Sequence, residues 1–335
     1  MKKRALGALL AVSMVATLLV GCGKNSTTQN STKEATEGTT EEATTDETQK
    51  PEKYGIVIKV LSSEFWQSMK TGIENKAKEL GVEVEVLAAN SEDDVEGQVT
   101  VFESMIQSGE YCGFGVAPLS DSNLVNTVAE ANQAGYLVAN IDEQINPDTL
   151  AAQGGSVVCF VTTDNKVVGK TAGDYIASLL KSGDEVAIIE GKAGAVSGED
   201  RKAGCQEAFE AAGLKIVDSQ PADWDKTKAY DLATNLISKN ENLKAIYCCN
   251  DTMAMGAQEA VANSGKDILV VGTDGNSDAI ASVQAGNLTA TIAQDPGTVG
   301  GRALELLVEA YRNGDKPGDK DKVDERINPI LIKQD

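Results

Sequence analysis

The sequence predicts an α/β protein made of two doubly wound parallel-sheet lobes. From Tyr54 onward, short runs rich in β-branched residues alternate with longer segments of helical periodicity. Repeated strand–helix units of this kind indicate parallel sheets with right-handed crossovers. The pattern holds about ten strands, which is many for one small sheet, so two lobes are expected. A TIM barrel is the alternative on this pattern alone.

The predicted elements follow one another regularly along the chain. Predicted strands occupy residues 54–61, 83–87, 114–117, 136–141, 157–161, 185–189, 215–217, 245–248 and 268–271. The clearest predicted helices occupy residues 65–80, 95–107, 123–134 and 166–181. The first and third of these helices stop at Gly81 and Gly135, because glycine adopts the left-handed conformation that commonly ends a helix.

Composition restricts the classes of function. The chain has 335 residues, of which 41% are hydrophobic, enough for two ordinary domains. Its formal charge is 30 − 51 = −21, which repels phosphate backbones, so no nucleic-acid partner is expected. Histidine is absent, which excludes imidazole bases and imidazole metal ligands. We therefore expect no catalytic residues, no cofactor and no metal site.

The first residues read as an export signal. Lys2, Lys3 and Arg4 precede the uncharged residues 5–20, a run shorter than the ~20 residues that cross a bilayer. The following Leu-Val-Gly-Cys at 19–22 resembles a bacterial lipobox. This predicts a lipoprotein signal peptide at 1–22 and lipidation of Cys22. The alternative is an ordinary cleaved signal with an incidental cysteine.

Residues 23–53 are predicted to be a disordered acidic, Thr-rich tether. Residues 24–53 hold nine Thr and seven acidic residues, with no Val, Ile, Leu, Met, Phe, Trp or Cys. Such a segment buries too little apolar surface to offset its conformational entropy.

Five further cysteines lie in the body of the chain, mostly in apolar runs. Their number is odd and their spacing matches no zinc pattern, so buried free thiols are expected, with a disulfide as the alternative. They are Cys112, Cys159, Cys205, Cys248 and Cys249.

Candidate binding residues follow the predicted strands directly. Ligands of open α/β sheets lie beyond the carboxyl ends of the strands. The segments at those ends contain carboxylates, an amide, an arginine and aromatic rings, with no nucleophile–base pair and no phosphate loop of P-loop spacing. They are residues 62–66, 142–143, 191–201, 250–251 and 274–275.

Taken in order, several motifs resemble the ribose-binding class of type I periplasmic sugar-binding proteins, which serve ABC importers. The motifs are residues 65–66, 142–143, 220–225, 250–256, 271–275 and 290–294. The resemblance covers residues 54–334 and is greatest to the allose-binding members, through Lys59, Trp66, the pair Asp142 and Glu143, and residues 190–194. Ribose binders usually carry arginine where this chain has Glu143. The family commonly has Asn-Pro where this chain has Ser-Glu at 63–64.

The resemblance implies two lobes joined by a three-strand hinge. The N-terminal lobe would comprise residues 54–159 and 295–324, and the C-terminal lobe residues 160–294 and 325–335. The sugar-binding residues implied in the first lobe are Lys59, Phe65, Trp66, Asp142 and Glu143, with Ser63 at the mouth of the site. Those implied in the second lobe are Arg201, Trp224, Asn250 and Asp274, with Gln294 at the hinge.

These residue types suit a sugar. Carboxylates and amides can each bond two neighbouring hydroxyls, and aromatic rings cover the C–H faces of a pyranose. Lys59 and Arg201 donate hydrogen bonds and offset the carboxylate charge.

Each candidate also has a plain structural alternative. Lys59 could be an exposed edge charge, Phe65 and Trp66 could be core, and Asp142 and Asp274 could cap helices. Trp224 could pack under a loop, and Arg201 could pair with Glu199. Of the pair at 250–251, Asp251 is expected to cap the helix while Asn250 points into the cleft.

We therefore expect a monomeric binding protein that captures a monosaccharide by lobe closure and delivers it to an ABC permease. A D-allose-like hexose is expected, with ribose and allulose as alternatives. The lipobox and tether indicate lipid anchoring to the cell membrane, on the outer surface of a Gram-positive cell. The rival functions are a sugar sensor partner of a surface receptor and a secreted carbohydrate enzyme. A repressor of the related fold is disfavoured by the export signal and by the lack of a basic headpiece before Tyr54.

Overall fold

The computed structural model describes residues 51–319 and 322–334, which belong to one folded unit. Two six-stranded sheets with helices between their strands confirm the predicted pair of doubly wound lobes. The predicted signal peptide, the lipidation site Cys22 and nearly all of the predicted tether lie outside the described residues. The first strand begins at Lys53, so the last residue of the predicted tether is already part of the sheet.

The first sheet is wholly parallel, with strand order β11-β5-β4-β3-β1-β2. Its strands are β1 (Lys53–Ile58), β2 (Glu83–Ala88), β3 (Gly113–Val116), β4 (Leu137–Ile141), β5 (Cys159–Thr163) and β11 (Val323–Ile327). Its helices are α1 (Glu64–Leu80), α2 (Val95–Ser108), α3 (Val125–Gln133), α4 (Pro147–Ala152) and α10 (Pro296–Arg312). The order reverses between β1 and β3, so the crevice of this lobe lies there.

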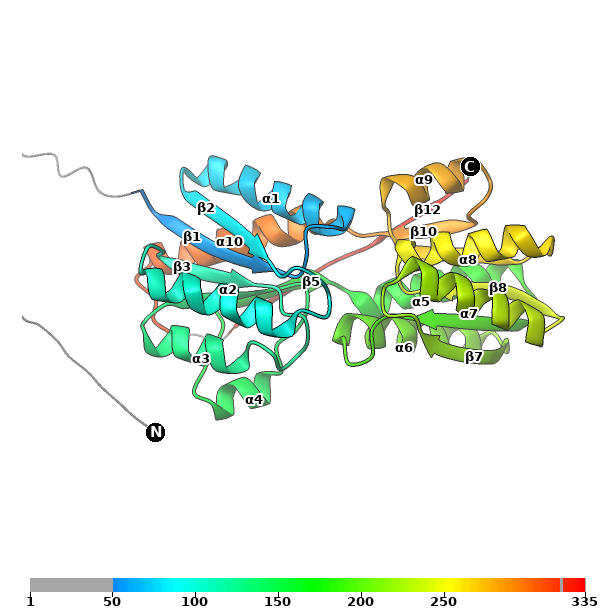
Figure 1. Cartoon of the computed structure of the whole chain (residues 1–335), viewed down its shortest axis with the longest axis horizontal. Coiled ribbons are helices and arrows are strands. Elements are labelled where there is room, and N and C mark those ends of the chain that lie inside the picture. The colour runs from blue at the N-terminus through cyan, green and yellow to red at the C-terminus, as the bar shows by residue number, and fades with distance from the viewer. Residues whose placement is uncertain (1–50, 320–321, 335) are drawn as a thin grey trace, which may run out of the picture. The chain divides into compact units, whose positions relative to one another are not determined.

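Helices cover both faces of the first sheet, as the side-chain alternation of β1 requires (Figure 1). Ile56 and Ile58 point to the face covered by α1 and α10, whereas Val57 points to the face covered by α2 and α3. All three side chains are fully buried. Burial of each large apolar side chain contributes about 1.5–3 kcal/mol, which explains the continuous apolar run of this strand.

The second sheet repeats the same winding in the order β12-β10-β9-β8-β6-β7, with only β12 antiparallel to its neighbour. Its strands are β6 (Glu185–Glu190), β7 (Lys215–Pro221), β8 (Leu243–Cys248), β9 (Leu269–Asp274), β10 (Ala290–Ala293) and β12 (Ile330–Lys333). Its helices are α5 (Asn165–Leu179), α6 (Val196–Ala211), α7 (Lys226–Lys239), α8 (Asp251–Ser264) and α9 (Ser277–Gln284).

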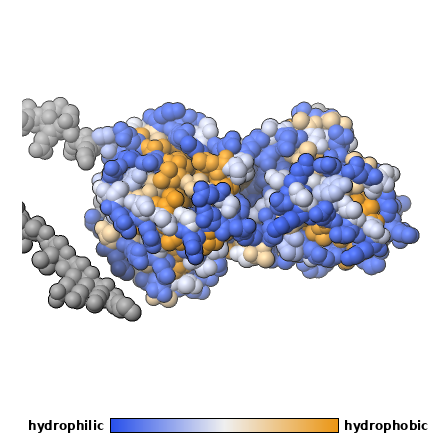
Figure 2. Space-filling view, in the orientation of Figure 1, coloured by the Kyte–Doolittle hydropathy of each residue, from blue (hydrophilic) through white to orange (hydrophobic). Residues whose placement is uncertain are grey.

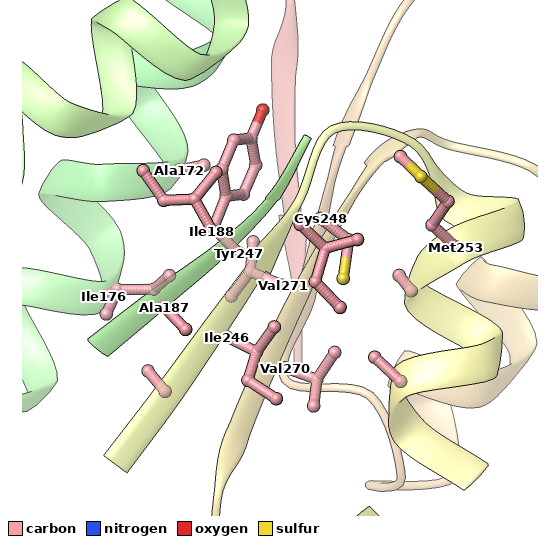
Figure 3. Close-up of a cluster of buried hydrophobic side chains, with 14 of the residues drawn as sticks. Ala172, Ile176, Ala187, Ile188, Ile246, Tyr247, Cys248, Met253, Val270 and Val271 are labelled. Atoms are coloured by element: carbon pink, nitrogen blue, oxygen red, sulfur yellow. The ribbon is translucent and has the colours of Figure 1, made fainter. Parts of the chain in front are cut away.

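The core of the second lobe packs α5 against one side of the sheet and α8 against the other (Figure 3). Tyr247 is fully buried on the α5 side, where its hydroxyl forms a 3.0 Å hydrogen bond with that of Thr273. Met253 fills the α8 side. Because the tyrosine hydroxyl has a partner, its burial leaves no polar atom unsatisfied.

The five cysteines of the described residues are free thiols, as predicted. Four are buried and Cys112 is half-buried. Burial raises the pKa of Cys159 and of Cys249 to about 12, so both remain protonated at neutral pH.

The chain crosses between the two sheets after β5, after β10 and after β11. The predicted lobe boundaries at 159 and 324 need correction, because β5 and β11 pair with each other along their whole length within the first sheet. Residues 160–163 and 325–327 therefore belong to the first lobe. The crossovers follow Thr163 and Ile327, while the boundary at 295 agrees with the end of β10.

In space-filling view, apolar residues gather on the first lobe over β2 and α2, amid a largely hydrophilic surface (Figure 2). A shallow groove at this position is lined by residues of both elements, including Leu87, Val101 and Met105. Within residues 51–319 and 322–334, no helix is both long and apolar enough to span a membrane.

Candidate functional site

A cavity of about 230 Å³ is lined by residues of both lobes. It is smaller than the roughly 300–1,000 Å³ of pockets for drug-sized molecules, so it suits a small ligand. Nine of the eleven predicted site residues line it: Lys59, Ser63, Phe65, Trp66, Asp142, Arg201, Trp224, Asn250 and Asp274. Most come from loops or helix starts that follow strands, as the rule for open sheets predicts.

The aromatic wall of the first lobe belongs to both the core and the cavity. Phe65 and Trp66 open α1 directly after the loop that follows β1. Their rings meet edge to face, with centroids 5.0 Å apart, and both are buried. Lys59 Nζ lies 5.8 Å from the Trp66 ring centroid. Each ring packs on the core, as the structural alternative for Phe65 and Trp66 has it, and each ring also lines the cavity. The two interpretations are therefore compatible.

Trp224 supplies the aromatic side of the second lobe. It sits in a turn with a positive φ of 63°, next to Asp223 with φ of 54°. Two glycines make room for the indole. A Cβ on Gly191 would lie 2.0 Å from Trp224 Cη2, and one on Gly198 would lie 3.1 Å from the same atom. The indole thus packs against the backbone of the loop after β6, as the structural alternative has it, and also lines the cavity.

Asp142 lies just beyond β4 in a left-handed conformation, with φ of 61°. Its main-chain amide donates to Val161 O, and its carbonyl accepts from Thr162 Oγ1, so the backbone is fixed on β5. Its side chain is buried, yet Oδ1 has no hydrogen-bond partner. Burial raises the pKa of Asp142 to about 6, against the opposing effect of Lys59. It caps no helix, since α4 is capped by Asn146.

Asp274 ends β9 with φ of 125° and faces the same cavity. Gln294 Nε2 donates to its Oδ1 at 2.6 Å, and Arg201 Nη1 lies 3.5 Å from that oxygen. Burial raises the pKa of Asp274 to about 6, and the positive charge of Arg201 opposes this shift. A buried carboxyl at a strained backbone position is typical of a functional site.

At 250–251 the predicted helix cap is wrong, whereas the predicted place of Asn250 on the cavity agrees with the structure. Asn250 is the N-cap of α8, and its side chain accepts from Met253 N at 2.8 Å while also lining the cavity. Asp251 does not cap the helix. It is fully buried and accepts from Gly275 N and Asn276 N, both at 2.8 Å, and so fixes the loop after Asp274. Asparagine is as good an N-cap as aspartate, so residue type alone could not separate the two.

Arg201 is a buried positioning cation rather than a surface partner of Glu199. Its Nε donates to Asn165 Oδ1 and its Nη1 to Cys249 O, both at 2.8 Å. The helix that carries it packs so closely on α5 that a Cβ on Gly169 would lie 1.8 Å from Arg201 O. The ion pair with Glu199 is instead made by Lys202.

Two predicted residues do not line the cavity, Glu143 and Gln294. The Glu143 side chain is fully buried and pairs with Lys59 Nζ at 3.0 Å, behind the cavity wall. Its predicted contact with the sugar stays a prediction. Burial is the largest single effect and lowers the pKa of Lys59, but the charges of Glu143, Glu92 and Asp142 together outweigh it and hold the pKa above its usual value. Lys59 is therefore a buried ion-pair member facing the ligand space, not an exposed edge charge.

Gln294 lies directly after β10, at a crossover between the lobes, behind Asp274. Its Oε1 is buried and has no hydrogen-bond partner. Among the described side chains only three buried polar atoms lack a partner, and two of them are Asp142 Oδ1 and Gln294 Oε1. Such atoms cost free energy unless something donates to them.

Five further residues line the cavity: Val60, Ser62, Glu92, Ser197 and Thr252. Ser62 and Ser197 lie within segments that the sequence marked as candidates, and Thr252 lies in the motif at 250–256. Glu92 lies in the loop after β2, so the same strand-end rule would have found it. Glu92 is the third carboxylate of the cavity, after Asp142 and Asp274. The cavity also contains two cations, Lys59 and Arg201.

Comparison with known proteins agrees with this architecture. A family model described as a periplasmic binding protein domain matches residues 54–316. The chain is 49% identical over 287 residues to the D-allose-binding periplasmic protein of Escherichia coli, which spans 84% of this chain and 92% of that protein. It is 36% identical over 251 residues to the ribose import binding protein of Bacillus subtilis, over 75% of this chain and 79% of that protein.

A solved structure of an ABC transporter periplasmic solute binding protein from Actinobacillus succinogenes with bound D-allose has a TM-score of 0.78 to this chain. The two are 30% identical, and the match covers 84% of this chain and 97% of the other. The chain therefore belongs to the periplasmic binding protein family, as its motifs predict, and is a binding protein rather than an enzyme.

Proposed function

We propose that this chain is the sugar-binding component of an ABC importer and that its ligand is D-allose or a closely similar monosaccharide. The relatives that support this proposal are named for D-allose and ribose. The site residues of this chain supply the chemistry that such a ligand needs.

The observation that carries the proposal is an unsatisfied acceptor on the cavity wall. Asp142 Oδ1 is buried, belongs to a residue that lines the cavity, and has no donor. Sugar hydroxyls are donors, and each hydrogen bond to a charged group contributes about 1.5–3 kcal/mol. Rings from both lobes, Trp66 and Trp224, line the same cavity and can cover the C–H faces of a pyranose.

Allose is favoured over ribose by the polar groups near the first lobe's strand ends. Lys59 and Glu143 form a buried ion pair, and Lys59 reaches the cavity. The resemblance to ribose binders predicts arginine in place of Glu143. The greater identity to the D-allose-binding protein than to the ribose-binding protein supports the same preference.

Closure of the lobes is the proposed mechanism of capture. The cavity takes Lys59, Trp66 and Asp142 from the first lobe and Trp224 and Asp274 from the second. A sugar in contact with both sets stabilises the closed arrangement. Shifting a hinge from mostly open to mostly closed takes about 5.5 kcal/mol of differential affinity, within reach of a few hydrogen bonds to charged groups. The closed form would then deliver sugar to a membrane permease.

We further propose that the protein acts as a monomer held at the outer face of the cell membrane by a lipid on Cys22. The lipobox-like residues 19–22 and the acidic, Thr-rich segment at 23–53 support anchoring through a tether. Mass spectrometry of protein extracted from membranes is expected to show diacylglycerol on Cys22. A Cys22→Ala chain is expected to lose the modification and to be released from the membrane.

Calorimetry on soluble Lys50–Asp335 with a panel of aldohexoses, ketohexoses and pentoses tests the ligand. Allose is expected to bind most tightly, and the sugar is expected to be recovered unchanged. Equal affinity for ribose and allose would contradict the preference assigned to Lys59 and Glu143. Absence of binding to every monosaccharide would overturn the proposed function.

Sugar affinity is expected to fall as the pH drops through 6. The pKa values of Asp142 and Asp274 are raised to about 6, so both carboxylates are ionised at pH 7.5 and mainly protonated at pH 5. Hydroxyl donors favour the ionised form, so the dissociation constant should rise about tenfold for each carboxylate across this range. Calorimetry at both pH values checks this, and an unchanged dissociation constant would contradict it.

A further inference from the structure

Two helices of the second lobe begin without a side-chain cap of their own. The N-cap of α6 is Ala195 and that of α9 is Asn276, and neither side chain accepts a hydrogen bond from its helix. The other three helices of this lobe are capped by their own N-cap residues, Asp164, Asp225 and Asn250. An uncapped start leaves main-chain N–H groups and a partial positive charge that favour a carboxylate.

A first-lobe carboxylate supplies the missing cap of α6. Glu143 Oε1 accepts from Val196 N at 2.5 Å and from Ser197 N at 3.3 Å, while its Oε2 accepts from Ser197 Oγ at 2.8 Å. Glu143 follows β4 of the first sheet, and α6 belongs to the second lobe. The contact therefore joins the lobes.

A second first-lobe carboxylate supplies the missing cap of α9. Glu64, the first residue of α1, accepts from Ser277 N at 3.1 Å and from Ser277 Oγ at 2.8 Å. Unlike Glu143, Glu64 is exposed, and it does not line the cavity. The same arrangement of carboxylate, main-chain amide and serine hydroxyl thus occurs twice across the two lobes.

In a third contact across the lobes, the second lobe supplies a cation and the first lobe supplies the acceptors. Lys192 Nζ, from the loop after β6, donates to Glu92 O at 2.6 Å and to Asp93 Oδ1 at 2.7 Å. The Asp93 side chain is largely exposed, so this ion pair is screened by solvent and contributes little. The two helix caps are the more specific contacts.

We propose that Glu143 and Glu64 form a closing latch in which first-lobe carboxylates complete two second-lobe helices only when the lobes are shut. The latch would stabilise the closed arrangement without touching the sugar, and so raise apparent affinity by slowing ligand escape. Its effect on affinity depends on the proposed sugar-binding function, whereas its effect on the start of α9 does not.

Glu64→Gln is the sharpest test, because Glu143→Gln would also leave Lys59 without its buried partner. The variant keeps size and removes the charge at an exposed position, so folding should be unaffected. Calorimetry and stopped-flow kinetics on Lys50–Asp335, which contains both lobes, should show allose binding about three- to fivefold weaker, through faster dissociation. The matched control is Glu96→Gln, another exposed first-turn glutamate of the first lobe, in α2, whose main-chain carbonyl accepts a side-chain hydrogen bond from within that helix.

The outcomes separate cleanly. Wild-type affinity in Glu64→Gln, or an equal loss in Glu96→Gln, would overturn the latch. If the wild-type chain binds no sugar, the proposed function fails, and the latch is decided instead by hydrogen exchange of chains held shut by a cross-link between Asp93→Cys and Lys192→Cys, whose side chains meet across the lobes. Faster exchange in the first turn of α9 in Glu64→Gln than in wild type would support the proposal, and equal exchange would overturn it.

Discussion

Asp274→Asn is expected to weaken sugar binding at least about 100-fold. The Asp274 carboxylate accepts from Gln294 Nε2 at 2.6 Å and lies 3.5 Å from Arg201 Nη1. These contacts hold the carboxylate in place, so that its remaining lone pairs can accept hydrogen bonds from a sugar in the cavity. Losing two charge-assisted hydrogen bonds to sugar removes roughly 3 kcal/mol or more, and each 1.4 kcal/mol is tenfold in affinity. Asparagine keeps the size and tolerates the positive φ of this position better than alanine would.

The loss should be separable from unfolding. Because burial raises the folded-state pKa of Asp274 to about 6, this group favours the folded state below its unfolded pKa, and that contribution is lost as the pH rises through 6. At pH 7.5 the buried charge therefore costs stability, and unliganded Asp274→Asn should melt no lower than wild type. Asp267→Asn, an exposed carboxylate of the same lobe, is the control for calorimetry. A loss below fivefold in Asp274→Asn would contradict this role for Asp274.

The two-sheet architecture could be predicted because the central strands are buried on both faces and read as apolar runs. Peripheral strands carry no such signal. The edge strand β7 continues through Ser219 and Gln220 to Pro221, beyond the predicted end at 217, since its residues are partly exposed. The strands β11 and β12 are not predicted, because they lie at the outer edges of their sheets and none of their residues is buried. The interior strand β10 is also not predicted, because it has only four residues and Ile292 is its one large apolar side chain.

Most of the site could be predicted because strand ends and family motifs point to the same residues. What sequence could not supply is the pairing between lobes. Glu143 stands beside Asp142 in the chain, yet only Asp142 faces the cavity, because the next residue turns its side chain to Lys59 and to the start of α6. The cap that Glu64 gives to Ser277 joins residues 213 positions apart and depends on the arrangement of both lobes.

Gly191→Ala is expected to weaken sugar binding about 30-fold by displacing Trp224. The added Cβ would lie 2.0, 2.3 and 2.5 Å from three atoms of the indole, distances that no relaxation of a methyl group alone can relieve. The ring must therefore move, and its backbone already holds a positive φ of 63°. Loss of the aromatic face of the second lobe is expected to reduce the binding free energy of the sugar by about 2 kcal/mol.

The neighbouring Gly198 also lies against the indole, because a Cβ on Gly198 would be 3.1 Å from Trp224 Cη2. The ring therefore cannot avoid a methyl group on Gly191 by moving toward Gly198. Gly297→Ala is the matched control, because its Cβ would meet nothing closer than 3.6 Å. Calorimetry on both variants and a change in tryptophan fluorescence in Gly191→Ala alone would show that the indole has moved. Wild-type affinity with shifted fluorescence would mean that Trp224 does not contact the sugar, because the ring would then have left its place without consequence for binding.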